Sequence, residues 1–285
     1  MTAWRPMARS VGWVIVYLAA GLLLTALPFV LYIRYAPTPD VAALAGNSTA
    51  LLLQGVAQLL VFGFLTWLIG CRVLGMSASQ LGWVKAGGSA AFGKGLLGAA
   101  VLAGIALLLA VAFGGARWLP DTGGVLDYLR SVGATTALLA PAALAEEVAF
   151  RGLPLVLLAA VFGRGTAIVV MSLIFGLAHG LNPDVTPLAI GNVALAGVFL
   201  SLAFYAPGGI WTAWGAHLGW NATLAALDAP VSGLPFRIPL INFDPGMVDW
   251  FSGGNFGPEG GVAATLALCV GCVALARYSR KDEAA

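Results

Sequence analysis

Charged side chains are scarce in this sequence. Lys, Arg, Asp and Glu together make up 9% of its 285 residues, whereas an ordinary soluble domain has roughly 25%. Hydrophobic residues make up 60%, and the mean hydropathy is +0.94. A surface so poor in charge is stable in lipid rather than in water, which excludes a water-soluble enzyme.

Basic clusters and a cysteine framework are also lacking. The net charge is +2 and no run of Lys or Arg forms an electrostatic footprint, so nucleic acid is excluded as a partner. The three cysteines are too few for a disulfide framework. Cys269 and Cys272 have the spacing of a redox or metal pair. They lie in an apolar run with no histidine nearby, so we interpret them as packing residues.

What the sequence has in abundance is apolar runs of about 20 residues, the length that crosses a bilayer as a helix. We predict an all-α, polytopic bundle with about eight transmembrane helices, forming a single membrane domain over residues 1–285. The predicted spans are Ser10 to Ile33, Ser48 to Ile69, Phe92 to Phe113, Ala134 to Leu158, Gly165 to Leu181, Pro187 to Tyr205, Ile210 to Leu227 and Gly261 to Ala276. The first is longer than the roughly 7–15 residues of a signal-peptide core, so we expect it to be retained.

The basic residues divide unevenly between the two sides of these spans. If the N-terminus is cytoplasmic, the inner side carries Arg5, Arg9, Arg72, Lys85, Lys94, Arg164, Arg277, Arg280 and Lys281, and the outer side carries Arg34, Arg117, Arg130 and Arg237. This bias predicts that both termini are cytoplasmic.

The connection from Asp228 to Gly260 is unusually long and holds five prolines, which forbid a continuous helix. Loops of this length are usually lids or binding loops, or are disordered. Its aromatic residues, among them Phe243, Trp250 and Phe256, are unsuited to a free linker. The segment 228–260 is therefore predicted to be an outer loop, either a lid over a cavity or an aromatic anchor at the membrane surface.

Two acids and one arginine lie inside the fourth predicted span. Each ionisable group near the bilayer centre costs about 2.5–3.5 kcal/mol, so such groups are functional candidates. Arg151 follows Glu147 by four residues, the spacing at which the two side chains meet on a helix. Glu146 points about 100° away from Glu147 and has no local counter-charge. A carboxylate so placed in an apolar setting is suited to accept a proton, so Glu146 is the candidate general base. The alternative is a structural ion pair beside a second acid that bonds to other helices.

The only two histidines of the chain both lie in predicted spans. His217 and Asn221 are four residues apart, so they project from one helix face about 6 Å apart along the axis, and both can donate hydrogen bonds. His179 lies in another span. A lone intramembrane histidine usually bonds one helix to another. Two of them, with an amide and a carboxylate pair elsewhere in the membrane, favour a shared site in one cavity.

Other chemistries have weaker signals. No His-Glu-x-x-His motif of a zinc protease is present. Ser172 lies two turns before His179, but a small hydroxyl in a span is usually a packing residue. A proton-coupled transporter also uses intramembrane Glu and His, yet the sequence lacks the paired halves that such transporters show.

The motifs Glu146-Glu147-x-x-x-Arg151, Phe175-x-x-x-His179 and His217-x-x-x-Asn221, in this order and within spans, resemble those of the CAAX prenyl protease and bacteriocin-processing (CPBP, or Abi) family. The resemblance covers residues 130–225, which would form the catalytic core. It implies an intramembrane endopeptidase of the glutamate type. In such an enzyme Glu146, assisted by His179, activates water, while His217 and Asn221 stabilise the oxyanion and Arg151 holds Glu147 ionised.

The resemblance also sets expectations for cofactor and substrate. We expect no cofactor, since Asn221 is a poor zinc ligand and a good oxyanion donor; the alternative is a divalent metal such as Zn²⁺ held by Glu146, Glu147, His179 and His217. The expected partners are the lipid bilayer and a membrane-associated peptide or protein substrate. The Ala-, Gly- and Leu-rich composition is typical of a bacterial cytoplasmic-membrane member, for which a prenylated substrate is doubtful. A non-catalytic scaffold or immunity protein of the same fold stays open.

Overall fold

The computed structural model describes residues 4–35 and 47–282. In chain order its elements are α1 (Trp4–Tyr35), α3 (Ser48–Leu65), the π-helix η1 (Thr66–Val73), α4 (Gly88–Gly114), β1 (Arg117–Pro120), α5 (Val125–Phe150), α6 (Leu153–Phe162), α7 (Arg164–Ala178), α8 (Pro187–Tyr205), α9 (Ile210–Ala226), β2 (Ile241–Asp244), α10 (Asp249–Ser252), the short 3₁₀ turns η2 (Gly254–Phe256) and η3 (Pro258–Gly260), and α11 (Val262–Asp282). The predicted all-α class is confirmed, apart from one two-stranded antiparallel sheet.

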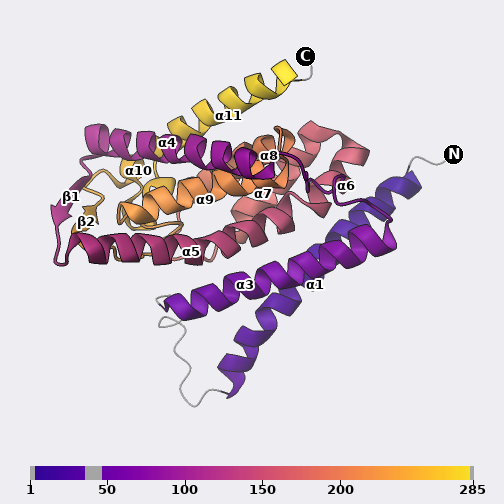
Figure 1. Ribbon diagram of the computed structural model, residues 1–285, viewed down its shortest axis with the longest axis horizontal. Helices are drawn as coiled ribbons and strands as arrows, with labels where there is room; N and C mark the ends of the chain where they lie inside the picture. Colours follow the sequence, from indigo (N-terminus) through magenta and orange to yellow (C-terminus); the bar gives the residue numbers. More distant parts are fainter. Residues whose placement is uncertain (1–3, 36–46, 283–285) are drawn as a thin grey trace.

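The helices form a central bundle, and α1, α3 and α11 pack on its outside. Helices α4, α5, α7, α8 and α9 pack together, and the two-stranded β1–β2 sheet lies at one end of this bundle (Figure 1). On one side, α3 packs on α5 and α1 packs on α3 and α6. On another side, α11 packs against α4 and α8. The residues predicted to be functional therefore come from central helices, screened on several sides by apolar ones.

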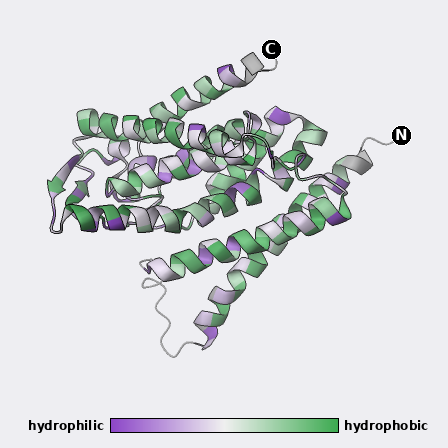
Figure 2. Ribbon diagram, in the orientation of Figure 1, coloured by the Kyte–Doolittle hydropathy of each residue, from purple (hydrophilic) through white to green (hydrophobic). Residues whose placement is uncertain are grey.

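Lipid is the natural solvent of the outer helix faces. Within the described residues, four helical segments are long and apolar enough to cross a membrane, namely Met7–Tyr32, Ser48–Val73, Gly88–Gly114 and Pro187–Tyr205, and two shorter apolar helices are Arg164–Ala178 and Val262–Tyr278. Figure 2 shows α3 and α4 as mostly hydrophobic, and Leu23 of α1 and Leu108 of α4 are 72% and 67% exposed. The protein is an integral membrane protein, and the count of eight spans stays a prediction.

The prediction of one continuous span from Ala134 to Leu158 is wrong. Helix α5 ends at Phe150 and α6 begins at Leu153. Pro154 explains the break, because proline has no N–H to donate and its ring clashes with the carbonyl four residues earlier, so it kinks or breaks a helix and is favoured in the first turn, where α6 holds it. The chain therefore turns just after Glu146 and Glu147.

Glycines bring α4 and α9 into close contact. A Cβ added at Gly215 or Gly219 of α9 would collide with the carbonyl oxygen of Phe92 or Leu96 on α4. Small residues four apart allow this approach of two helix backbones in a membrane. Because His217 lies between the two glycines, the contact fixes the position of its backbone.

The 228–260 loop folds back on the bundle. The Asp228 carboxylate accepts hydrogen bonds from the Ile238 N–H at 2.6 Å and the Phe243 N–H at 3.1 Å. Strand β2 pairs antiparallel with β1, and Phe256 is 1% exposed. The loop holds no long helix, as its prolines predict, but it is packed rather than free. Its function as a lid stays a prediction.

Candidate active site

Three helices supply the predicted site residues. Glu146 and Glu147 lie near the end of α5, and His217 and Asn221 lie on α9. The sequence predicted that His179 lies inside a span, and this prediction is wrong. Helix α7 ends at Ala178, and His179 caps it with φ −91° and ψ 3°. The cap position lets the imidazole turn toward α5 and α9 instead of following the axis of α7.

A buried ion pair supports the site. The Arg151 guanidinium lies 3.0 Å from Glu147 Oε1, and the two side chains are 1% and 0% exposed. The i,i+4 spacing predicts this contact. What the spacing does not reveal is a third member: His217 Nδ1 lies 2.7 Å from the same Glu147 oxygen. Glu147 therefore holds both the arginine and one of the two histidines.

Glu146 faces both imidazoles. Its Oε2 lies 3.9 Å from Nε2 of His179 and 3.9 Å from Nε2 of His217. This distance is too long for a direct hydrogen bond and within reach of one bridging water. Oε2 is buried and has no hydrogen-bond partner among the described residues, although the Glu146 side chain as a whole is 30% exposed.

The partners of the two Nδ1 atoms define which imidazole nitrogens face Glu146. His179 Nδ1 lies 2.8 Å from the Phe175 carbonyl oxygen, which can only accept a hydrogen bond, so this nitrogen carries the proton. His217 Nδ1 donates in the same way to the Glu147 carboxylate. In the neutral form, each ring then presents the lone pair of Nε2 toward Glu146. Protonation of His217 would turn its Nε2 into a donor.

Phe175 packs against three residues of the site, a role that the sequence did not predict. The Arg151 guanidinium lies over its ring at 4.2 Å, and the centroids of His179 and His217 lie 4.7 Å and 6.2 Å from it. Its position one turn before His179 is the signal that could have revealed this role. Phe175 fixes both imidazoles and covers the cation.

Asn221 and Ser172 have different surroundings. Asn221 is half-buried on α9, one turn after His217, where the i,i+4 spacing predicts it. Ser172 is 3% exposed and packs against Gly197 of α8, where an added Cβ would lie 2.9 Å from the Ser172 Cβ. This agrees with its interpretation as a packing residue.

Glu259 is a third buried carboxylate, in the 228–260 segment that was predicted to be an outer loop, and the sequence did not mark it as a site residue. It is 8% exposed. Its Oε1 accepts from Trp220 Nε1 at 3.0 Å, and its Oε2 accepts from the backbone N–H and the hydroxyl of Ser232. Burial raises the pKa of Glu259, while the bonds from Ser232 and the nearby His179 and His217 lower it. No local pattern marks this residue, because its partners come from α9 and a distant turn.

The donor set suits a metal poorly. Glu147, one of the four ligands in the metal alternative, is committed to Arg151 and His217. Within the part of the chain that the structure describes, no group of three or more His, Cys, Asp or Glu residues is arranged to hold a metal ion. We therefore derive no step through a metal.

A comparison with protein families identifies the segment that carries these residues. Residues 129–223 match the model described as "Type II CAAX prenyl endopeptidase Rce1-like". Over this segment the chain is similar to the CAAX protease (CPBP) family. The match spans 95 of the 285 residues and contains Glu146, His179 and His217. No curated protein and no solved structure matches the chain.

This similarity to a type II CAAX prenyl endopeptidase model supports a protease. The matched segment ends before the 228–260 loop, and the catalytic core of residues 130–225 stays a prediction. Glu259 therefore lies outside the part of the chain that the family model describes.

Proposed function

We propose that the protein is an intramembrane endopeptidase of the glutamate type, which hydrolyses a peptide bond of a membrane-associated peptide or protein. The observation that carries the proposal is the position of Glu146 Oε2, 3.9 Å from Nε2 of both His179 and His217. One water molecule between a carboxylate and an imidazole can lose a proton to the base as it attacks a carbonyl carbon.

In the proposed first step, Glu146 takes a proton from water while the water oxygen attacks the scissile carbonyl. His179 Nε2 accepts a hydrogen bond from the same water and orients it, because the Phe175 carbonyl holds the proton on Nδ1. The carbonyl oxygen becomes an oxyanion. Glu146 then returns the proton to the leaving amine as the carbon–nitrogen bond breaks, leaving a carboxylic acid and an amine as products.

His217 and Asn221 are proposed to stabilise the oxyanion. They lie one turn apart on α9, so their donors can point to one place. The hydrogen bond from His217 Nδ1 to Glu147 at 2.7 Å stabilises positive charge on the imidazole, as the buried aspartate of a catalytic triad does. Arg151 in turn holds Glu147 ionised. Glu147 and Arg151 are thus positioning residues, one contact removed from the substrate.

The setting in the cell follows the sequence. We propose a bacterial cytoplasmic membrane with both termini cytoplasmic, on the distribution of basic residues. We also propose that the reaction needs no metal, because Glu147 is occupied by Arg151 and His217. A chelator should then leave the rate unchanged. Loss of activity with a chelator, restored by added Zn²⁺, would contradict this part of the proposal.

The test uses the full-length protein in detergent and a library of membrane-protein peptides, with new peptide ends identified by mass spectrometry. We expect cleavage by the wild type and a rate lower by about 10²–10⁴ for Glu146→Gln, which keeps the shape but cannot accept the proton. Asp184→Asn is the matched control, because it neutralises an exposed acid outside the site. Its rate should equal that of the wild type.

Two outcomes would contradict the proposal. If Glu146→Gln cleaves as fast as the wild type, Glu146 is not the base. If the wild type cleaves no peptide while remaining folded, the protein is a non-catalytic scaffold or immunity protein of this fold. Proton uptake coupled to solute transport in vesicles would favour the transporter.

A further inference from the structure

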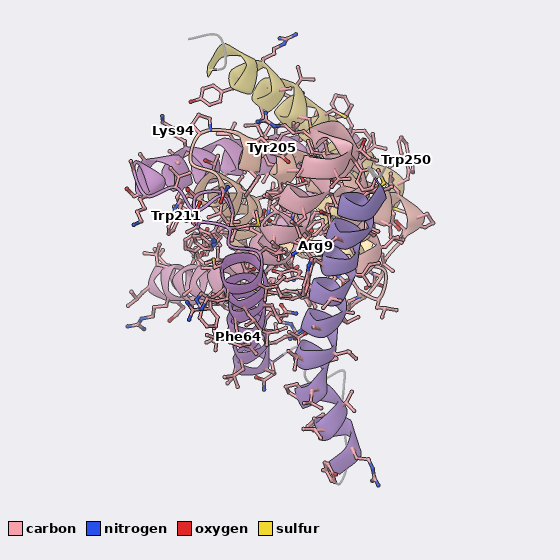
Figure 3. The ribbon with its side chains drawn as sticks, turned by 90° about the vertical axis from the view of Figure 1, so that its right-hand side faces the viewer. Arg9, Phe64, Lys94, Tyr205, Trp211 and Trp250 are labelled. Carbon is pink, nitrogen blue, oxygen red and sulfur yellow. The ribbon has the colours of Figure 1, made fainter. Side chains whose placement is uncertain are left out.

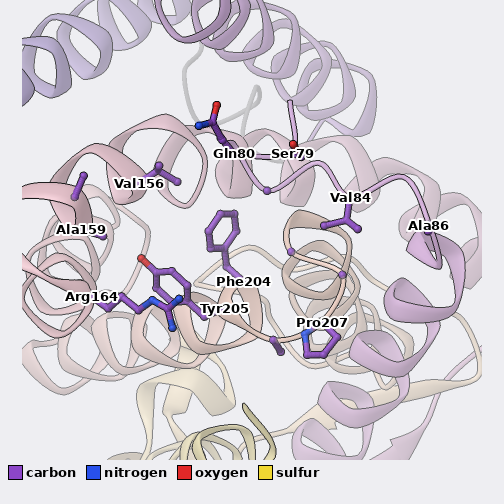
Figure 4. Close-up of a pocket in the computed structure, with 15 residues that line it drawn as sticks. Ser79, Gln80, Val84, Ala86, Val156, Ala159, Arg164, Phe204, Tyr205 and Pro207 are labelled. Atoms are coloured by element: carbon purple, nitrogen blue, oxygen red, sulfur yellow. The ribbon is translucent and has the colours of Figure 1, made fainter. Parts of the chain in front are cut away.

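A pocket with one charged side chain, Arg164, lies outside the proposed active site, at the end of the bundle where α6 meets the turn between α8 and α9. Its volume is about 850 Å³. One wall is the segment around Gln80 and Val84, which is fixed to α9 by a hydrogen bond from Trp211 Nε1 to the Val84 carbonyl at 3.0 Å. Figure 4 shows Arg164 and Tyr205 side by side at one end of this pocket, and neither Glu146 nor a histidine lines it.

An apolar groove adjoins the pocket. It has a volume of about 630 Å³, lies between α4, α8, α9 and α11, and is lined by small residues such as Gly98 and Gly271. The residues that line both cavities are Ala86, Ala206, Pro207 and Gly208. The pocket, which holds Arg164, and the apolar groove therefore adjoin along these shared residues.

The dimensions of the groove suit an acyl chain. Along α4 its lining begins at Gly87, just before the helix starts, and extends to Leu102. At 1.5 Å per residue this is about 22 Å, which exceeds the roughly 15 Å of hydrocarbon in one leaflet. The pocket that holds Arg164 lies beyond the start of α4, and lipid headgroups lie at the ends of a membrane-spanning helix.

The charges favour an anion at the end of the pocket that holds Arg164. The Arg164 guanidinium lies 4.9 Å from the centre of the Tyr205 ring, at the first residue of α7, where the helix dipole adds positive potential. The Tyr205 hydroxyl has no hydrogen-bond partner among the described residues. Lys94 lines the groove, and neither lining contains an acidic residue. Figure 3 labels Lys94 and Tyr205 in a view of this end.

We propose that this site binds one anionic phospholipid, with its phosphate at Arg164 and one acyl chain in the groove between α4 and α11. The inference does not depend on the proposed peptidase activity. A charge-assisted contact explains the choice of headgroup, and the groove explains why a whole lipid, rather than a free anion, is bound.

The first experiment tests the headgroup. Full-length protein in detergent is mixed with equal amounts of phosphatidylglycerol and phosphatidylcholine of the same acyl chains, and retained lipid is counted by native mass spectrometry. We expect one phosphatidylglycerol to be retained in preference. Arg164→Gln should lower this preference about tenfold, and Arg164→Lys should keep most of it. Arg130→Gln, which removes an exposed arginine of α5, should change nothing.

The second experiment tests the groove. Gly98→Leu should abolish retention of the lipid, because an added Cβ has open space there and the longer side chain would fill the groove. Gly104→Leu is the matched control, since its Cβ also has open space but the residue does not line the groove. An unchanged apparent Tm establishes that each variant is folded.

Three results would overturn the proposal. Equal retention of both lipids by the wild type would show that the headgroup is not recognised. Equal weakening of retention by Arg130→Gln and Arg164→Gln would indicate unspecific charge. Displacement of phosphatidylglycerol by inorganic phosphate, with Gly98→Leu still binding, would indicate a simple anion site without a role for the chain.

Discussion

Replacing Glu147 by Gln should destabilise the fold, whereas the same replacement at Glu146 should not. Arg151 is 1% exposed and lies 3.0 Å from Glu147 Oε1. The amide can still accept a hydrogen bond, but it leaves the buried guanidinium without a counter-charge. Removing one partner of a buried ion pair costs about 3–5 kcal/mol. At roughly 2–4 °C per kcal/mol, the apparent Tm should fall by about 6–20 °C.

The assay is thermal unfolding in detergent, with three variants compared with the wild type. Glu146→Gln is the matched control, because it neutralises the neighbouring acid and leaves the ion pair intact, and its apparent Tm should change far less. Arg151→Met added to Glu147→Gln should recover most of the loss, because it removes the unpaired charge and keeps a long side chain. If the double variant is no more stable than Glu147→Gln, an uncompensated charge is not the cause. Equal losses for the two single variants would refute the division of roles.

Three further predictions concern α9 and the residues around it. Trp220→Phe should cost about 1.5–3 kcal/mol in unfolding free energy, because it removes a donor to the buried Glu259 carboxylate. Trp214→Phe loses a hydrogen bond to a neutral backbone carbonyl, so it should cost only about 0.5–1.5 kcal/mol. Equal losses in thermal unfolding would contradict this ranking. Gly219→Ala should cost about 1–3 kcal/mol, since its Cβ collides with the backbone of α4, and a variant as stable as the wild type would show that the two helices are less closely packed. Asn221→Ala should lower kcat by about 10²–10³ with little change in apparent Tm, and an unchanged kcat would exclude Asn221 as an oxyanion donor.

The sequence alone determined those relations between site residues that lie within one helix. The contact between Glu147 and Arg151 follows from four-residue spacing, and so does the shared face of His217 and Asn221. The rarity of charge inside apolar runs marked these positions as functional. Hydropathy likewise predicted most helices, because the length and composition of a span are local properties. The break at Pro154 was also visible locally, but the apolar run across it hid the end of α5.

Only the tertiary structure decided which partners these side chains meet. His217 is joined to Glu147 across 70 residues of sequence, and Trp220 to Glu259 across 39. Such contacts depend on how α5, α9 and the 228–260 loop approach one another, and the position of α9 depends in part on glycines that let it touch α4. A carboxylate between Pro258 and Gly260 has the same sequence pattern whether it is solvated or buried. Its burial depends on donors supplied by distant parts of the chain, because a buried charge is stable only where such donors surround it.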